Sequence, residues 1–432
     1  MNKVYQEQNV WDATQERLAY IFREFDNVLV AFSAGKDSGV MLNAAYRYAK
    51  ETGQLSKLAF YYMDYEAGYR HTHEYAQRTF DSLTECRRYW LCLPISAACA
   101  VSMHQTSWTP WDADQKAIWV REMPTGGYVV SEDNCQFQFT KGIKGFDARI
   151  DFAKWFAAKH GKTAVLVGIR ADESLSRLAM ITSARRSSMY KGIRHSSVVD
   201  EKKVNFWPIY DWGVEDVWVA NGKLGFDYNK IYDLFYKAGL SLPQMRVASP
   251  FHQCGQESLH LFKVIDPDSW AKMVGRVNGV NFTAIYGGTT AMGWRRITKP
   301  PHFTWKQYAE FLLSTLPDAT RKKYETKIAK SQWHWREQGG ARGAEFIAQI
   351  EKEGWKIRRT GIKRGKNNDE VVFIDEMMDD TAVDEFRKAP TWKRVCVAIM
   401  RNDVNCLYMG FKRTKGQAQR RLEAMKIFNE SK

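Results

Sequence analysis

The stretch that decides the fold runs from residue 28 to residue 42 and reads VLVAFSAGKDSGVML. Its first five residues form a continuous apolar run, which is typical of a strand that is covered on both faces, as in a parallel sheet. A small, polar turn follows, and it contains Ser33, Gly35, Lys36 and Ser38. The turn is therefore either a helix start with polar caps or a place that binds phosphate.

Strand and helix patterns alternate along the first half of the chain. Apolar residues at helical spacing predict a first helix over 11–25, with Asp12 as its N-cap. Further predicted helices cover 38–53 and 71–86, and the predicted strands cover 28–32, 57–66, 87–95, 162–170 and 204–210. This alternation predicts a doubly wound α/β fold with a mainly parallel sheet. Ligands of such sheets bind at the carboxyl ends of the strands, which is where the polar turn falls.

We expect the chain to have three parts. Residues 1–250 would form the α/β domain, 251–388 a basic and mainly helical domain, and 389–432 a small module with a β-hairpin over 392–411 and a closing helix over 415–428. The periodicity fails between about 103 and 150, where aromatic, proline and glycine residues are frequent. This insertion is expected to be either a lid or binding loop, or a flap that buries its tryptophans.

The composition of the 432 residues limits the class of protein. No apolar run approaches the roughly 20 residues that span a bilayer, and the N-terminus has no signal-peptide core. Seven cysteines, an odd number, argue against a secreted disulfide scaffold. We therefore expect a cytoplasmic protein with reduced thiols and no membrane partner. The net charge of +15 favours an anionic partner such as nucleic acid or a polyphosphate, and the oligomeric state is left open.

The polar turn lacks the pattern of the Walker phosphate loop, because only Gly35 precedes Lys36. The physical basis for anion binding is nevertheless present. A strand that passes through a small-residue turn into a helix directs backbone amides at one point, and the helix N-terminus adds a positive dipole. Lys36 adds a full charge, and Gly35 lets a ligand approach the backbone closely. Phosphate binding is therefore the stronger interpretation.

The turn resembles the PP-loop, SGGKDS, of the superfamily that contains the N-type ATP pyrophosphatases and the phosphoadenosine-phosphosulfate (PAPS) reductases. The matching residues are Ser33, Gly35, Lys36, Asp37 and Ser38. Ala34 replaces the first glycine of the loop, a change that removes some backbone freedom but leaves room for phosphate.

Two further stretches resemble the same superfamily. LVGIRADESLSR (166–177) resembles its second signature, through Gly168, Arg170, Asp172, Glu173, Ser176 and Arg177. FWPIYDWGVEDVWVA (206–220) resembles a segment of PAPS reductases, through Pro208, Trp212, Asp216, Val217 and Trp218. The first stretch alone would also suit a salt-bridged helix start, because Glu173 and Arg177 are four residues apart. The resemblance extends over most of the chain to a group of PAPS-reductase-like bacterial and phage proteins, which are often linked to a ParB-like partner.

The resemblance implies an adenine nucleotide alpha hydrolase-like fold and a site that binds ATP or PAPS with Mg²⁺. Lys36, Asp37 and Arg170 are the implied catalytic residues. The implied nucleotide-binding residues are Ser33, Ala34, Gly35, Lys36, Asp37, Ser38, Asp64, Gly168, Arg170, Asp172, Glu173 and Arg177. Asp37 or Asp64 would contact Mg²⁺. No iron–sulfur cluster is expected, because Cys86, Cys92 and Cys99 lack the tight spacing of cluster motifs.

Three functions remain open. The first is cleavage of ATP between the α and β phosphates, which forms an adenylylated intermediate. The second is PAPS reduction by a thiol, for which Cys254 in HQCGQE is the candidate and His252 would lower the pKa of its thiol. The third is a nucleotide-gated regulator that contacts DNA or RNA, or a ParB-like protein. Its basic stretches are RKKYETK (321–327), RRTGIKRGK (358–366) and FKRTKGQAQRR (411–421).

Overall fold

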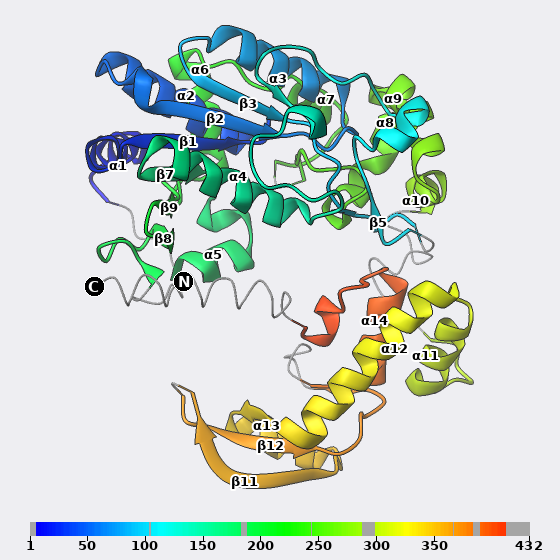
Figure 1. Ribbon diagram of the computed structural model, residues 1–432. Helices are drawn as coiled ribbons and strands as arrows, with labels where there is room; N and C mark the ends of the chain where they lie inside the picture. The colour runs from blue at the N-terminus through cyan, green and yellow to red at the C-terminus, as the bar shows by residue number, and fades with distance from the viewer. Residues whose placement is uncertain are drawn as a thin grey trace.

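The computed structural model describes residues 6–102, 105–182, 188–242, 244–286, 299–365, 367–382 and 389–411. A seven-stranded sheet lies at the centre of its first half (Figure 1). In spatial order the strands are β6 (Val129–Val130), β3 (Arg87–Leu91), β2 (Leu58–Met63), β1 (Asn27–Phe32), β7 (Thr163–Val167), β9 (Lys203–Phe206) and β8 (Ser196–Asp200). Neighbouring strands are parallel except β8 and β9, which are antiparallel. The predicted doubly wound, mainly parallel sheet is confirmed.

The order of the strands places β1 in the middle of the sheet. After β1 the chain builds outward through β2 and β3, and it then returns to the other side of β1 to form β7 and β9. The carboxyl ends of β1 and β7 therefore form the point where the winding direction reverses. Crevices at such points are where open α/β sheets bind ligands.

Helices cover both faces of the sheet. One face packs against α1 (Val10–Glu24), α2 (Lys36–Glu51), α3 (Arg70–Ser82) and α6 (Val214–Leu224). The other face packs against α4 (Gly145–His160) and apolar residues of the insertion. Alternate residues of β1 divide between the two layers: Val28 and Val30 face the first, and Leu29 faces the second. Burial on both faces explains the continuous apolar runs of these strands.

The predicted N-cap of the first helix is wrong by three residues. Asn9 caps α1, and its side chain accepts a hydrogen bond from the backbone amide of Asp12 at 2.9 Å. Asp12 itself lies in the first turn, where its negative charge stabilises the helix N-terminus. Asparagine is as strong an N-cap as aspartate, so composition alone did not distinguish the two positions.

The insertion is folded tightly against the sheet domain. Its short elements are β5 (Ser107–Trp108), which pairs with β4 (Ala97–Ala98), and then η2 (Ala113–Ile118), β6 and η3 (Glu132–Asn134). Trp108 and Trp111 are buried, as the flap alternative expects. The insertion also adds β6 to the edge of the main sheet.

The second half of the chain continues from the sheet domain into a helical layer and then a separate lobe. Beside the insertion lie α7 (Ile231–Lys237), η6 (Gln253–Leu261), α8 (Phe262–Ile265), α9 (Pro267–Arg276) and α10 (Val280–Tyr286). The lobe below them in Figure 1 contains α11 (Trp305–Ser314), α12 (Asp318–Trp333), η8 (His334–Gln338), β10 (Gly340–Arg342), α13 (Ala344–Lys352), β11 (Ile357–Arg364), β12 (Asp369–Ile374), α14 (Trp392–Met400) and η9 (Leu407–Met409). Shorter elements of the sheet domain are η1 (Leu55–Lys57), η4 (Ala171–Glu173) and α5 (Leu175–Thr182).

The predicted C-terminal hairpin is wrong. Residues 392–400 form α14, whose apolar side pairs with α11 to bury Val395, Ala398 and Ile399. A short apolar run with β-branched residues suits a strand or a buried helix equally, and packing decided for the helix. The small antiparallel sheet lies earlier, where β12 pairs with β10 and β11. The predicted closing helix over 415–428 lies outside the described residues.

Among the residues that the structure describes, no helix is both long enough and apolar enough to cross a membrane.

Candidate phosphate-binding site

The polar turn lies directly after the carboxyl end of β1 and leads into α2. The backbone amide of Ser33 donates to Ser38 Oγ at 3.0 Å, and the two hydroxyl oxygens are 2.9 Å apart. Ser38 Oγ also donates to the carbonyl of Gly35 at 3.1 Å. These bonds fold the turn back on the first turn of α2, so the loop has a defined shape without a ligand.

Ala34, which replaces the first glycine of the resembled motif, adopts a left-handed backbone conformation with φ of 55°. Its side chain is fully buried. Glycine reaches this conformation without a steric penalty, whereas alanine does so at a cost of about 1–2 kcal/mol. The mismatch therefore preserves the shape of the loop at the expense of local strain.

The end of β7 packs against the start of α2. A Cβ atom at Gly168 would lie 2.8 Å from the carbonyl oxygen of Asp37 and 3.0 Å from the amide nitrogen of Ser38. A side chain at position 168 would therefore push these backbone atoms aside. Gly168 belongs to the site because it has no side chain, which brings two segments more than 100 residues apart into contact.

Arg170 and Asp37 form the charged centre of the site. Arg170 is buried, and its guanidinium binds the carboxylates of Asp37 and Asp172. Asp37 also lies 3.4 Å from the ammonium of Lys36. The structure thus brings together the three predicted catalytic residues, Lys36, Asp37 and Arg170.

Glu173 and Arg177 lie further out, in η4 and α5. Their side chains form an ion pair at 3.7 Å with the four-residue spacing of a helix surface. Arg246, from the helical layer, donates to the carbonyl of Glu173 at 2.9 Å. The local ion pair that the sequence offered as an alternative is present here.

Asp64, which the resemblance places near the nucleotide, is fully buried and already bound. It forms an ion pair with Arg121 from the insertion and accepts a hydrogen bond from Trp90 Nε1 at 2.6 Å. Burial is the largest influence on Asp64 and opposes its ionisation, but the charge of Arg121 and the hydrogen bonds from Trp90 and Arg121 together lower its pKa below the ordinary value. The structure therefore places Asp64 in the contact between the sheet and the insertion.

Glu66 and Arg276 form a second buried ion pair that sequence analysis missed. Arg276 in α9 binds both carboxylate oxygens of Glu66, at 2.8 and 3.1 Å. Glu66 also accepts hydrogen bonds from the backbone amides of Trp111 and Val120 in the insertion. No local pattern signals a pair that is separated by 210 positions. The pair joins the sheet, the insertion and the helical layer beside the site.

Three contacts from residues 229–245 hold the polar turn, and sequence analysis missed them too. Asn229 Nδ2 donates to the carbonyl of Ala34 at 3.0 Å. The backbone amide of Lys36 donates to the hydroxyl oxygen of Tyr232 at 3.0 Å, and Lys36 Nζ donates to the carbonyl of Met245 at 3.3 Å. Asn229 and Tyr232 flank the start of α7, far from the loop in sequence, so only the tertiary fold reveals them.

Cys254 lies at the exposed start of η6. His252 does not contact its thiol. Instead, His252 Nδ1 accepts a hydrogen bond from the backbone amide of Cys254 at 3.2 Å and caps the helix. The structure therefore shows His252 in a capping role.

Several cations of the predicted basic stretches are ion-paired. Arg358 lies 2.9 Å from Asp375, and Arg359 lies 2.6 Å from Glu370. Most of the basic stretch over 411–421 lies outside the described residues.

The carboxylates of the site do not fit a protein-held metal ion. Asp37 and Asp64 are each neutralised by an arginine. Within the described part of the chain, no group of three or more histidine, cysteine, aspartate or glutamate side chains is placed to hold a metal. We therefore assign no step of the chemistry to a metal ion held by this chain.

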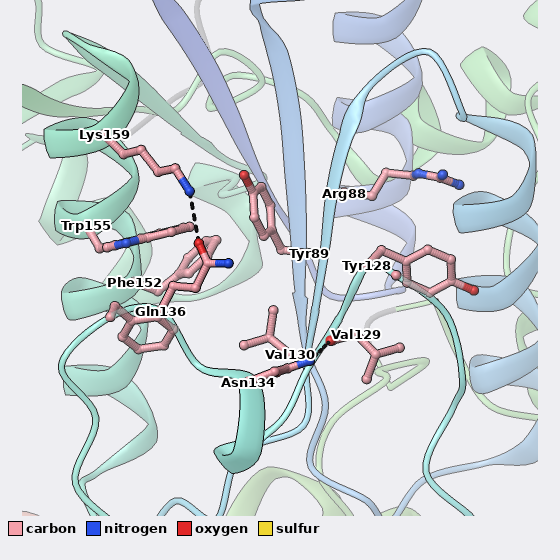
Figure 2. Close-up of a pocket in the computed structure, with 12 residues that line it drawn as sticks. Arg88, Tyr89, Tyr128, Val129, Val130, Asn134, Gln136, Phe152, Trp155 and Lys159 are labelled. Atoms are coloured by element: carbon pink, nitrogen blue, oxygen red, sulfur yellow. Dashed lines mark hydrogen bonds between the residues drawn. The ribbon is translucent and has the colours of Figure 1, made fainter.

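A separate pocket of about 260 Å³ lies at the edge of the sheet (Figure 2). Tyr89 and Trp155 line it, and Lys159 Nζ donates to Gln136 Oε1 at 2.9 Å. Its β3 residues lie near the amino end of that strand, whereas the polar turn follows the carboxyl end of β1. The pocket is therefore not part of the site described above.

Comparison with known proteins identifies both halves of the chain. Residues 27–238 match the model of the phosphoadenosine phosphosulfate reductase domain, and residues 239–420 match that of a domain of unknown function, DUF3440. The chain is also 31% identical over 418 residues to the uncharacterized protein YbdN of Escherichia coli (strain K12). This alignment covers 96% of this chain and 93% of that protein. The chain belongs to one family with YbdN, and its first half is a phosphoadenosine phosphosulfate (PAPS) reductase domain.

Solved structures of low sequence identity also resemble this chain. The PAPS reductase of Candida auris, a phosphate complex, is 12% identical over 54% of this chain and 94% of that chain, with a TM-score of 0.29. The FMN adenylyltransferase of Candida glabrata with FMN and an ATP analogue is 11% identical over 54% of this chain and 64% of that chain, with a TM-score of 0.31. The NH3-dependent NAD synthetase of Campylobacter jejuni is 13% identical over 64% of this chain and 96% of that chain, with a TM-score of 0.27.

Proposed function

We propose that the protein is a PP-loop enzyme that binds ATP and cleaves it between the α and β phosphates. The observation that supports this most is the place of the loop. It lies after the central strand, at the positive N-terminus of α2, with Lys36 and the buried Arg170 beside it. The PAPS reductase domain over residues 27–238 supports an adenine nucleotide as the ligand.

In the proposed reaction an acceptor oxygen attacks the α-phosphorus of ATP. The bond between that phosphorus and the oxygen that bridges to the β-phosphate breaks, pyrophosphate leaves, and the acceptor becomes adenylylated. A hydroxyl acceptor loses its proton in this step, and a water acceptor yields AMP. Lys36, the amides at the start of α2 and Arg170 would stabilise the negative charge on the phosphates. Any Mg²⁺ would arrive with ATP as part of the substrate.

Incubation of the full chain with α-labelled ATP and Mg²⁺ tests this proposal. We expect labelled AMP or an adenylylated acceptor, together with pyrophosphate. Lys36→Met should lower the rate by roughly 100-fold or more, because a charge that acts in the transition state is lost. Lys50→Met is the matched control, since this exposed lysine lies at the far end of α2. Release of ADP, or equal rates for Lys36→Met and the wild type, would contradict the proposal.

PAPS reduction is a second candidate, supported by the exposure of Cys254 in the segment that follows the Lys36 contacts. The thiolate would attack the sulfur of PAPS, the bond between that sulfur and the phosphate oxygen would break, adenosine 3',5'-bisphosphate would leave, and an enzyme S-sulfonate would form. An external dithiol reductant would then release sulfite. Loss of sulfite release in Cys254→Ser, with no turnover of ATP by the wild type, would favour this function over the first.

A further inference from the structure

Tyr232 brings a hydroxyl group to the polar turn from the start of α7. Its side chain is 3% exposed, and its ring packs edge-on against Trp218 with 5.3 Å between the ring centroids. The backbone amide of Lys36 donates to the hydroxyl oxygen at 3.0 Å. The Lys36 amide and the packing of the ring therefore fix the position of the hydroxyl.

The proton of this hydroxyl has no acceptor among the residues that the structure describes. A tyrosine hydroxyl has one proton to donate, and here its oxygen serves as an acceptor. Burial, with the charge of Asp37, raises the pKa of Tyr232 above its ordinary value, so the proton is retained at neutral pH. A buried and oriented donor without an acceptor is a costly arrangement unless a ligand supplies one.

The hydroxyl lies over the part of the turn where a phosphate would sit. A Cβ atom at Gly35 would be 3.6 Å from Tyr232 Oη, so the hydroxyl lies next to the glycine of the loop. It also lies at the N-terminus of α2, where the helix dipole favours an anion. The Tyr232 hydroxyl proton and the positive N-terminus of α2 therefore lie at the same part of the turn.

We propose that Tyr232 is a phosphate-binding residue of this site, which donates its hydroxyl proton to an anionic oxygen of the bound nucleotide. The inference rests on the proposed function, because it assumes that a nucleotide phosphate occupies the loop. Met245, whose carbonyl binds Lys36, belongs to the part of the chain matched by the domain of unknown function. That second part would therefore complete the site of the first.

The test uses the full chain and two tyrosine variants. Tyr232→Phe removes the free donor and keeps the ring. Tyr75→Phe is the matched control, because Tyr75 is also buried beside α2 but donates its proton to the carbonyl of Asp227 at 3.3 Å. Binding of inorganic pyrophosphate, ATP and adenosine is measured by calorimetry for both variants and the wild type.

We expect Tyr232→Phe to weaken pyrophosphate and ATP binding roughly tenfold to hundredfold, as the loss of a hydrogen bond to a charged group predicts. Adenosine binding should stay within about twofold, and Tyr75→Phe should bind all three ligands like the wild type. Equal weakening of adenosine, or no weakening of pyrophosphate, would overturn the inference and leave the proposed function standing. Absence of pyrophosphate and ATP binding by the wild type would contradict both.

Discussion

Arg276 binds both carboxylate oxygens of Glu66, and neither side chain reaches solvent appreciably: they are 2% and 0% exposed. Glu66 lies three residues after the end of β2, and Arg276 is the last residue of α9 in the second half of the chain. Because the backbone amides of Trp111 and Val120 bond to the same carboxylate, one buried charge joins three segments. The sheet domain and the helical layer are therefore expected to unfold together.

Removal of Arg276 tests this connection. Arg276→Met leaves Glu66 as a buried charge without its partner, and we expect a loss of about 3–5 kcal/mol in the free energy of unfolding. Urea denaturation followed by tryptophan fluorescence measures it. Arg70→Met removes an exposed ion pair with Glu74 and should cost less than about 1 kcal/mol. Equal effects of the two substitutions would show that the buried pair does not join the segments.

Gly168 is expected to be irreplaceable for packing at the site. Gly168→Ala places a Cβ atom 2.8 Å from the carbonyl oxygen of Asp37, so the start of α2 must move. We expect ATP binding, measured by calorimetry, to weaken by at least tenfold. The control is Gly222→Ala on α6, where a Cβ atom meets nothing within 4 Å and alanine should stabilise the helix by about 0.5–1 kcal/mol. Unchanged ATP binding in Gly168→Ala would refute the close approach.

Ala34 offers a test of the strained turn. Ala34→Gly relieves the left-handed backbone but removes a buried methyl group and adds freedom to the unfolded chain, so we expect a net change in stability below about 1 kcal/mol. Ala34→Val adds a β-branched side chain at the same φ and should cost more than about 2 kcal/mol. Thermal unfolding of both variants distinguishes strain from simple loss of volume. If valine were tolerated, φ at this position would not be positive.

Lys203 predicts an unusual dependence of stability on pH. This lysine is 3% exposed, and burial lowers its pKa to about 8, against 10.5 ordinarily. Between pH 8 and 10.5 the unfolded chain holds a proton that the folded chain lacks, so stability should rise with pH. Below pH 8 Lys203 is protonated in both the folded and the unfolded chain, and burial of its charge lowers the free energy of unfolding by about 3 kcal/mol.

Lys203→Met should therefore stabilise the protein at pH 7 and gain little at pH 10.5. Urea denaturation at the two pH values measures the difference. Lys202→Met, at the exposed neighbouring position, should change stability by less than about 0.5 kcal/mol at both. A pH-independent effect of Lys203→Met would mean that Lys203 titrates normally.

Local patterns predicted the sheet domain well because its signals are local. The apolar run over 28–32, the polar turn and the helix after it lie within 25 residues, and the structure confirms them as β1, the loop and α2. Longer elements with a strong apolar periodicity were also predicted from their local sequence. The segment over 392–400 was not, because its apolar, β-branched residues suit a strand or a helix and packing against α11 made the choice.

By itself, the sequence determined the class of fold and the position of the polar turn after β1, and its resemblance to the PP-loop singled out Lys36, Asp37 and Arg170, which the structure brings together. Only the tertiary structure decided what surrounds them. Arg121 binds Asp64, and Tyr232 reaches the amide of Lys36 from 196 positions away. The reason is physical: a turn or a helix start depends on neighbouring residues, whereas a buried charge or hydroxyl takes its partner from whichever segment packs against it. Which segment packs there depends on how the helices and the sheet bury their apolar faces together.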